Sequence, residues 1–154
     1  MCRLGLSAPI RLIRKTPVFE QYKGADASLL VRTNFTDDAV WAKLCALAQE
    51  PSQDNFRAEL ICISDPRLAS AAPETIAKQV YQDLGHSAVF VADDRAMNDP
   101  EHPILCVCTH DAVVATFRVV PEEIWAPENN LRLANLDFAD FANAADADGV
   151  FRGS

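Results

Sequence analysis

The segment Ser87–Ala92 (SAVFVA) limits the possible folds of this chain more than any other segment. All of its residues are apolar or small, and Val89, Phe90 and Val91 favour a strand. A strand that is apolar on both faces is covered on both faces, as a central strand is when helices pack on each side of its sheet. The sequence therefore predicts an α/β fold built around this segment.

Strand-like and helix-like segments alternate before it. Leu29–Phe35 and Ala58–Ser64 are rich in strand-forming residues. A helix is expected to open at Thr36, which can cap it, and a second helix is expected over Pro73–Leu84, ending at Gly85. This strand–helix–strand–helix–strand order predicts right-handed crossovers and parallel pairing.

The second half of the chain has a different pattern. Asp93–Pro103 is expected to be a polar loop, and Ile104–Thr109 and Thr116–Val120 are expected to form a hairpin pair. The remaining expectations are a helical turn from Pro121, a short strand over Leu131–Leu136, a last helix capped by Asp137, and a loose tail pinned by Val150 and Phe151. The predicted architecture is a mixed, partly parallel sheet of five or six strands with helices packed on it.

The chain has 154 residues and a net charge of −8, and 49% of its residues are hydrophobic. This length predicts a single α/β domain over residues 28–154, preceded by a basic N-terminal extension over residues 1–27. That extension is compatible with a targeting segment, an edge strand or a flexible arm. No apolar run reaches the roughly 18–20 residues that span a bilayer, so no membrane partner is expected.

The charge is unevenly distributed and bears on the class of partner. Residues 1–23 carry +4, which leaves −12 on the remaining 131 residues. Such an acidic body repels a phosphate backbone, so nucleic-acid binding is not expected. It suits a basic protein partner, although the same acidity also serves solubility. Five cysteines without a CxxC pair indicate free thiols and a cytoplasmic location.

The sequence contains no motif of a cofactor enzyme. A P-loop, a GxGxxG fingerprint and an activated-serine elbow are all missing from it, so no nucleotide cofactor is expected. Acidic residues follow each of the first three strands and could hold Mg²⁺ at one edge of the sheet. The same residues serve as helix caps or turn residues, so no metal site is expected; they are Asp37, Asp38, Asp65, Asp93 and Asp94.

Four residues are the candidates for catalysis if the chain is an enzyme. Asp93 and His102 could transfer protons. Arg32 and Arg118 interrupt apolar strands, so each needs either an aspartate partner or an anionic ligand. The prolines beside His102 also allow a rigid exposed loop in which the imidazole meets only water.

A polar and aromatic cluster near the C-terminal end is a candidate binding surface. It consists of Trp125, Glu128, Asn129 and Asn130. Aromatic and amide side chains are common in recognition surfaces, and asparagines are equally common in turns. The pattern does not decide between these two interpretations.

The chain resembles a family of short uncharacterised proteins. The resemblance rests on LLVRTNFTDDAVW from Leu29, HSAVFVADD from His86, EHPILCV from Glu101 and the closing segment that begins FRVVPEEIW at Phe117. That family is a domain of unknown function in bacteria and some fungi, and the resemblance covers about residues 28–153. In size and acidity the chain is also similar to bacterial immunity-type domains. The family implies no catalytic residues.

Two hypotheses about function follow. The first is a non-enzymatic, acidic protein-binding module, immunity-like or accessory, that engages a basic protein. The alternative is a small cofactor-independent enzyme, such as an isomerase, cyclase or hydrolase, that holds a small anionic metabolite with Arg32 or Arg118. The sequence leaves the partner and the oligomeric state open.

Overall fold

The computed structural model of the chain describes residues 17–110 and 114–153. Its centre is a sheet of six strands: β1 (Ser28–Arg32), β2 (Leu60–Ile63), β3 (Ala88–Ala92), β4 (Ile104–Cys108), β5 (Thr116–Val119) and β6 (Val150–Phe151). Their order across the sheet is β2-β1-β3-β4-β5-β6. β1 pairs in parallel with β2 and β3, β4 is antiparallel to both of its neighbours, and β6 is parallel to β5. The prediction of a mixed, partly parallel α/β sheet is therefore confirmed.

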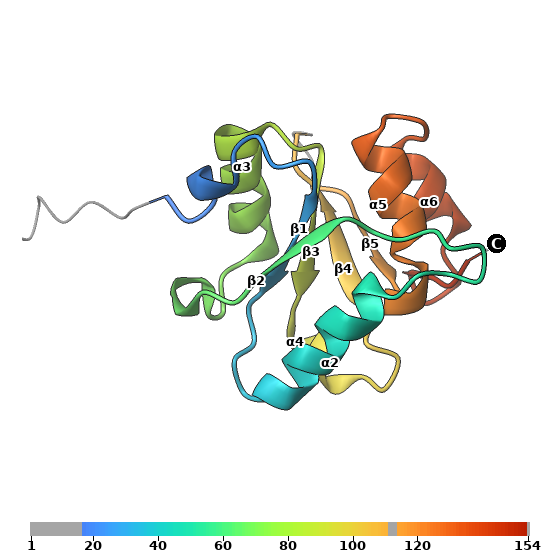
Figure 1. Ribbon diagram of the computed structural model, residues 1–154, viewed down its shortest axis with the longest axis horizontal. Helices are drawn as coiled ribbons and strands as arrows, with labels where there is room; N and C mark the ends of the chain where they lie inside the picture. The colour runs from blue at the N-terminus through green and yellow to red at the C-terminus, as the bar shows by residue number, and fades with distance from the viewer. Residues whose placement is uncertain (1–16, 111–113, 154) are drawn as a thin grey trace, which may run out of the picture.

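The helices cover both faces of this sheet (Figure 1). They are α2 (Asp38–Gln49), α3 (Pro73–Leu84), α4 (Asp94–Asn98), α5 (Trp125–Arg132) and α6 (Phe138–Ala144), with the short 3₁₀ turns η2 (Glu20–Tyr22), η3 (Pro66–Leu68) and η4 (Pro121–Glu123). One face is covered by α2, α5 and α6, and the other by α3 and η2.

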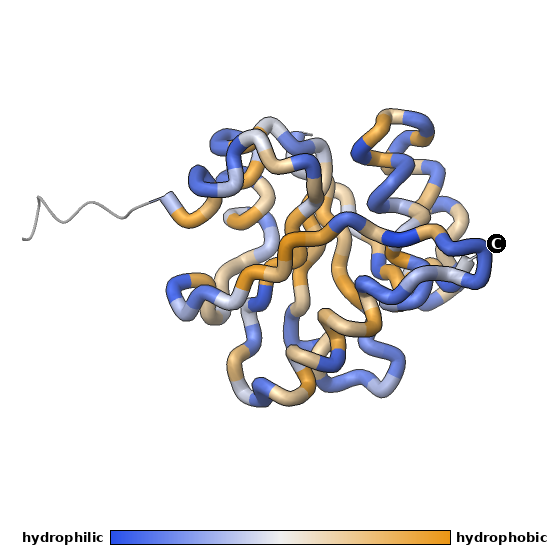
Figure 2. Tube along the Cα trace, in the orientation of Figure 1, coloured by the Kyte–Doolittle hydropathy of each residue, from blue (hydrophilic) through white to orange (hydrophobic). Residues whose placement is uncertain are grey.

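Strict alternation along the central strands produces two hydrophobic cores. Leu30 and Phe90 point to the face under α2, α5 and α6, whereas Leu29, Val31 and Val89 point to the face under α3. Every residue of β3 is buried, as the apolar segment around Val89 predicts, and every residue of β1 is buried as well. Figure 2 shows the result as a hydrophobic centre enclosed by more hydrophilic outer segments.

The two crossover helices begin and end at the residues that favour those positions. Asp37, not Thr36, caps α2, because its carboxylate accepts hydrogen bonds from the N–H groups of Ala39 and Val40. The helix α3 starts with Pro73 and ends at Gly85, whose φ of 71° lies in the left-handed region that glycine tolerates.

Three expectations about the second half are wrong. The stretch after β3 is not only a loop, because Asp93 caps α4 and Ala96 and Met97 bury themselves in the core. Leu131–Leu136 is not a strand, because Leu131 and Arg132 complete α5 and the following residues form turns and bends. The tail is more than a loose end, since Val150 and Phe151 pair with β5 as β6.

The N-terminal extension is described only in part, because residues 1–16 lie outside the described ranges. From residue 17 onward it lies against the domain, where Phe19 is buried in the core beneath α3.

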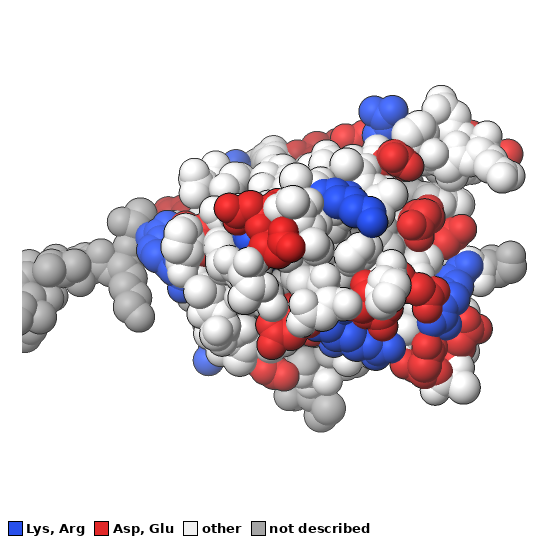
Figure 3. All heavy atoms as spheres, turned by 90° about the horizontal axis from the view of Figure 1, so that it is seen from below, with Lys and Arg blue, Asp and Glu red and all other residues white. Residues whose placement is uncertain are grey.

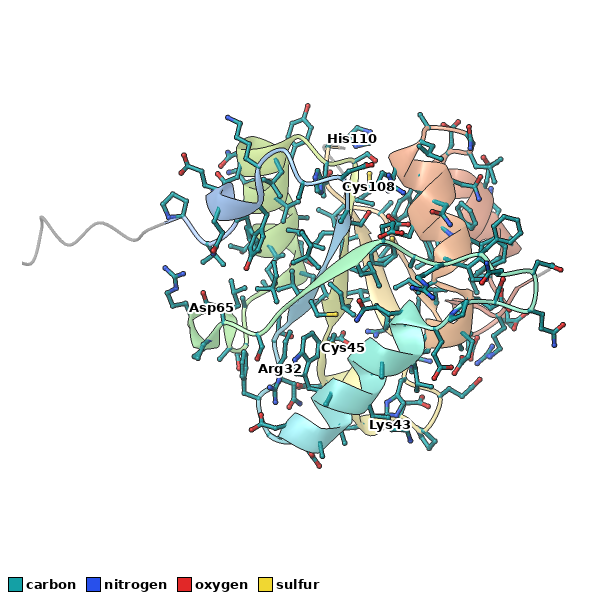
Figure 4. All side chains as sticks on the ribbon, in the orientation of Figure 1. Arg32, Lys43, Cys45, Asp65, Cys108 and His110 are labelled. Atoms are coloured by element: carbon teal, nitrogen blue, oxygen red, sulfur yellow. The ribbon has the colours of Figure 1, made fainter. Side chains whose placement is uncertain are left out.

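Because the chain moves to the opposite side of β1 between β2 and β3, the gap between the ends of β1 and β3 is a topological switch point. Ligands of open α/β sheets usually bind outside the carboxyl ends of the strands at such a point. We call the end of the sheet at which β1 and β3 finish the carboxyl edge, and the end at which these two strands begin the amino edge. Figure 4 places Arg32 at the carboxyl edge and Cys108 and His110 at the amino edge.

Candidate functional site

The acidic residues of the carboxyl edge serve mainly as caps. Besides Asp37, Asp65 accepts a hydrogen bond from the N–H of Arg67, and Asp93 accepts one from the N–H of Ala96. Within residues 17–110 and 114–153, no three histidine, cysteine, aspartate or glutamate side chains gather closely enough to hold a metal ion.

Asp93 and Arg118 come together at this edge. Nη1 of Arg118 lies 2.9 Å from Oδ1 of Asp93, and Nη2 lies 2.7 Å from Oδ2. Nη1 also donates to the carbonyl of Pro103 at 3.0 Å. Burial raises the pKa of Asp93, but the hydrogen bonds from Arg118 and from the N–H of Ala96 outweigh burial, so the pKa lies below its usual value. Asp93 is therefore a carboxylate held by its partner, which makes it a weak general base.

Arg32 lies on the opposite face of the sheet from Arg118. Arg32 shares the face of Leu30 beneath α2, whereas Arg118 is the cross-strand partner of Leu105, which belongs to the core beneath α3. The sheet therefore separates the two guanidinium groups that the sequence suggested as anion holders.

The Arg32 side chain is almost fully buried, and it is held from several directions. Its Nε donates to the carbonyl of Asn34 at 2.8 Å, and Nη1 donates to Ser64 at 3.2 Å. Oδ1 of Asp38 lies 2.9 Å from Nη2, but outside hydrogen-bonding geometry, so Nη2 gains an ion pair and no hydrogen bond. The rings of Phe35 and Trp41 lie 4.4 and 5.7 Å from the guanidinium carbon.

His102 is buried, which corrects the expectation of an exposed loop. Only 8% of its surface is accessible, and its Nδ1 lies 2.8 Å from the carbonyl oxygen of Ala96. Its backbone has a φ of 51°, in the left-handed region. The imidazole thus holds the α4–β4 connection together beside the Asp93–Arg118 pair.

The switch point contains a hollow of about 240 Å³. Thr33, Ser70, Pro73, Asp93 and Asp94 are among the residues that line it. The carboxylate of Asp94 is held by Nδ2 of Asn34 at 2.7 Å. Both carboxylates in this hollow therefore already have partners within the chain.

The polar and aromatic cluster on α5 connects neighbouring segments. Trp125 stacks on Phe56, with ring centroids 4.9 Å apart, and Asn129 donates to the carbonyl of Arg57 at 3.2 Å. Asn130 donates to the carbonyl of Ala126 within the helix. These three side chains therefore contact their own chain.

Glu128 is the most buried member of that cluster. Its Oε1 accepts hydrogen bonds from Ser28 at 3.0 Å and from Nε of Arg132 at 2.7 Å, and its Oε2 accepts one from the N–H of Glu59 at 3.2 Å. Arg132 also pairs with Asp26 at 2.7 Å. This network connects α5 to the beginnings of β1 and β2.

Two adjoining hollows of about 300 and 320 Å³ lie at the amino edge, and we call them together the amino-edge groove. Ser87, Leu131 and Ala134 line both of them. The first hollow also contains His86 and Arg132, and the second contains Cys108, His110 and Leu136. In the view of Figure 4, Cys108 and His110 lie at the top, between α3 and the α5–α6 pair.

Polar and apolar residues both line the amino-edge groove. Burial lowers the pKa of His86, so its imidazole is neutral at neutral pH. The sulfur of Cys108 lies 3.8 Å from Nδ1 of His110, and the His110 ring lies 6.2 Å from that of Tyr81. None of these residues was among the candidate site residues predicted from the sequence.

Exposed hydrophobic side chains concentrate around this groove. The described residues include five large hydrophobic side chains that are exposed: Phe56, Tyr81, Val114, Leu133 and Leu136. Leu136 lines the groove, Leu133 is adjacent to the lining residue Ala134, and Tyr81 contacts the lining residue His110. The sequence pattern over Leu131–Leu136 predicts a short strand and does not indicate this exposed cluster.

The positive charges of the described chain are largely neutralised internally. Six arginines form ion pairs with carboxylates: Arg32, Arg67, Arg95, Arg118, Arg132 and Arg152. Arg152 forms ion pairs with three carboxylates, those of Glu101, Asp146 and Asp148. Figure 3, which views the carboxyl edge, shows acidic side chains spread over that face with basic groups lying against them.

The sequence over residues 27–154 matches the family described as a domain of unknown function, DUF6924, and because this match spans most of the chain, the chain belongs to that family. The resemblance to an uncharacterised family is thereby confirmed. No curated protein sequence matches the chain at a significant level. Among the helices of the described ranges, none combines the length and the apolar character that crossing a membrane requires.

Proposed function

We propose that this chain is a non-enzymatic protein-binding module, and that its docking site is the amino-edge groove. The observation that carries the proposal is the clustering of Tyr81, Leu133 and Leu136, three of the five exposed large hydrophobic side chains, around one groove. Exposed apolar side chains gathered at a concave surface are characteristic of protein interaction sites.

The charge of the groove selects the kind of partner. The carboxylates of Asp26 and Asp137 line it, together with the partly buried ion pair of Glu128 and Arg132. The proposed partner is therefore a basic protein, which inserts an apolar side chain beside Leu136 and places flanking lysines or arginines at the acidic rim.

The proposal can be tested with a displayed library of random peptides selected on the purified chain. Enriched peptides are expected to place an apolar residue between lysines or arginines. A synthetic copy of an enriched peptide should bind more weakly as the salt concentration is raised. Leu136→Lys should weaken binding of that copy at least about tenfold, because it removes an apolar contact and adds a repulsive charge.

Phe56→Lys is the matched control, because Phe56 is similarly exposed but stacks on Trp125 at the opposite end of α5 from Leu131. It should leave peptide binding unchanged. A selection that enriches no peptide or mainly acidic peptides would overturn the proposal, and so would equal losses from Leu136→Lys and Phe56→Lys.

A second candidate is a small cofactor-independent enzyme acting at the carboxyl edge. It is favoured by one observation, the meeting of Asp93 and Arg118 beside the hollow at the switch point. It ranks second because the guanidinium of Arg118 already donates hydrogen bonds to both carboxylate oxygens of Asp93. Screening small carboxylates and phosphate esters for thermal stabilisation, with Arg118→Met as the control, tests it; stabilisation lost only in the variant would favour this candidate.

A further inference from the structure

Two cysteines lie face to face between α2 and the edge strand β2. Cys45 lies on α2 and Cys62 on β2, and both pack at the margin of the core beneath α2. Each is partly accessible, in contrast to the fully buried Cys106. Figure 4 labels Cys45 on the side of α2 that faces the sheet.

Gln49, one turn further along α2, connects the two cysteines. Its Nε2 donates to the carbonyl of Cys45 at 3.1 Å and to the sulfur of Cys62 at 3.5 Å. The two thiols are close enough for each to shift the pKa of the other. Two partly exposed thiols are therefore held together by a helix and a strand that are separated in sequence.

The interaction between the two thiols makes the sulfurs chemically different. The interaction with Cys45 lowers the pKa of Cys62 against the opposing effect of burial. The same interaction, reinforced by burial, raises the pKa of Cys45. Cys62 is therefore the thiol that ionises first, and Cys45 keeps its proton.

We propose that Cys62 and Cys45 form a dithiol site that reacts with hydroperoxides, with Cys62 as the nucleophile and Cys45 as the resolving thiol. The site is separate from the amino-edge groove. In Figure 4, Cys45 on α2 lies away from Cys108, which marks the groove at the amino edge.

The reaction is a two-electron oxidation of the thiol pair. The Cys62 thiolate attacks one oxygen of the hydroperoxide and breaks the O–O bond, and the departing alkoxide or hydroxide takes up a proton. The product is a sulfenic acid on Cys62. The Cys45 sulfur then attacks the Cys62 sulfur, its proton leaves with the hydroxyl group as water, and a disulfide forms. An added dithiol reductant returns both sulfurs to thiols.

The test uses the full chain carrying Cys2→Ser, so that the thiol outside the described residues takes no part. After treatment with hydrogen peroxide, intact-mass measurement should show the loss of two hydrogen atoms, and peptide mapping should join the peptides of Cys45 and Cys62. Both changes should be reversed by dithiothreitol. Cys106 serves as the internal control and should be alkylated only after denaturation.

Single variants assign the roles. Cys45→Ser should stop the reaction at a sulfenic acid on Cys62 that dimedone traps, whereas Cys62→Ser should lower the rate of peroxide consumption at least about tenfold. The disulfide mapping uses a chain in which Cys45 and Cys62 are both present. A folding defect in either single variant therefore does not affect that measurement. A disulfide through Cys106 or Cys108, or unchanged thiols at Cys45 and Cys62 after treatment, would overturn the proposal.

Discussion

Arg118 on β5 forms a two-pronged hydrogen-bonded ion pair with Asp93, which directly follows β3. Its Nη1 and Nη2 lie 2.9 and 2.7 Å from Oδ1 and Oδ2 of Asp93. The strand β4 lies between β3 and β5 in the sheet. The pair joins two strands that are not neighbours in the sheet. It also connects the antiparallel half of the sheet to the switch point.

Asp93→Asn should destabilise the fold by about 2 kcal/mol, because it leaves a partly buried guanidinium without its counter-charge. The folded-state pKa of Asp93 lies below its unfolded value near 3.9. The contribution of the pair is therefore complete above that value and disappears as the pH falls through the folded-state pKa. Urea titrations should show that the difference in unfolding free energy between the parent and the variant is smaller at about pH 3 than at about pH 7. An equal difference at both pH values would contradict this assignment.

Glu128→Ala should have a larger effect. The variant leaves Ser28, the N–H of Glu59 and Nε of Arg132 without their shared acceptor in a buried position. We expect a loss of about 3–5 kcal/mol in the free energy of unfolding, measured with urea. Asn129→Ala, which removes one hydrogen bond to the carbonyl of Arg57, is the control and should lose about 1 kcal/mol or less.

His86 should make the fold sensitive to mild acid. Burial places its folded-state pKa below the unfolded value near 6.5, so the unfolded chain binds a proton more readily. Stability should therefore fall as the pH drops below about 6.5, until the folded-state pKa is reached. Because the ring is only partly buried, the effect is small, and it should be missing in His86→Gln. Thermal unfolding of both chains between about pH 7.5 and pH 5 measures the difference.

Oxidation of the dithiol should stabilise the fold. A disulfide between Cys45 and Cys62 closes a loop of about 17 residues, which corresponds to about 3 kcal/mol and raises the melting temperature by about 6 °C or more. Differential scanning calorimetry of the oxidised and reduced chain checks the increase. A lower melting temperature after oxidation would indicate that the bond strains the contact between α2 and β2.

Leu136→Ser should leave the stability unchanged within about 0.5 kcal/mol, because Leu136 is exposed in the connection between α5 and α6. Chemical denaturation measures this value. A large loss would show that Leu136 supports the fold, and would remove it from the proposed docking site.

The sequence predicted the parts of the fold that depend on local pattern. Val89, Phe90 and Val91 are apolar on both faces, and that alone places β3 in the interior. Gly85 and Pro73 mark the ends of α3 because their backbone preferences are intrinsic. The strand β6 was missed because two residues carry no periodicity, and Val150 and Phe151 become a strand only when β5 lies beside them.

The candidate sites were harder to predict, because they depend on pairs. The sequence indicated that Arg32 and Arg118 each need a partner, and both have one in the structure. It could not indicate that they point to opposite faces, since that depends on the register between β4 and β5. The amino-edge groove was missed because Leu133 and Leu136 look like core residues until the path of the chain shows them exposed.

The order of the strands also bears on how fast the chain can refold. The strands β3, β4 and β5 pair with their neighbours in sequence, so this meander forms from nearby chain. The strand β1 must instead join Leu30 to Phe90, and β6 must join Val150 to Arg118. Distant pairings require loop closure before any contact stabilises them, and they slow folding. The strand β1, every residue of which is buried, therefore has the pairing that requires the longest loop closure.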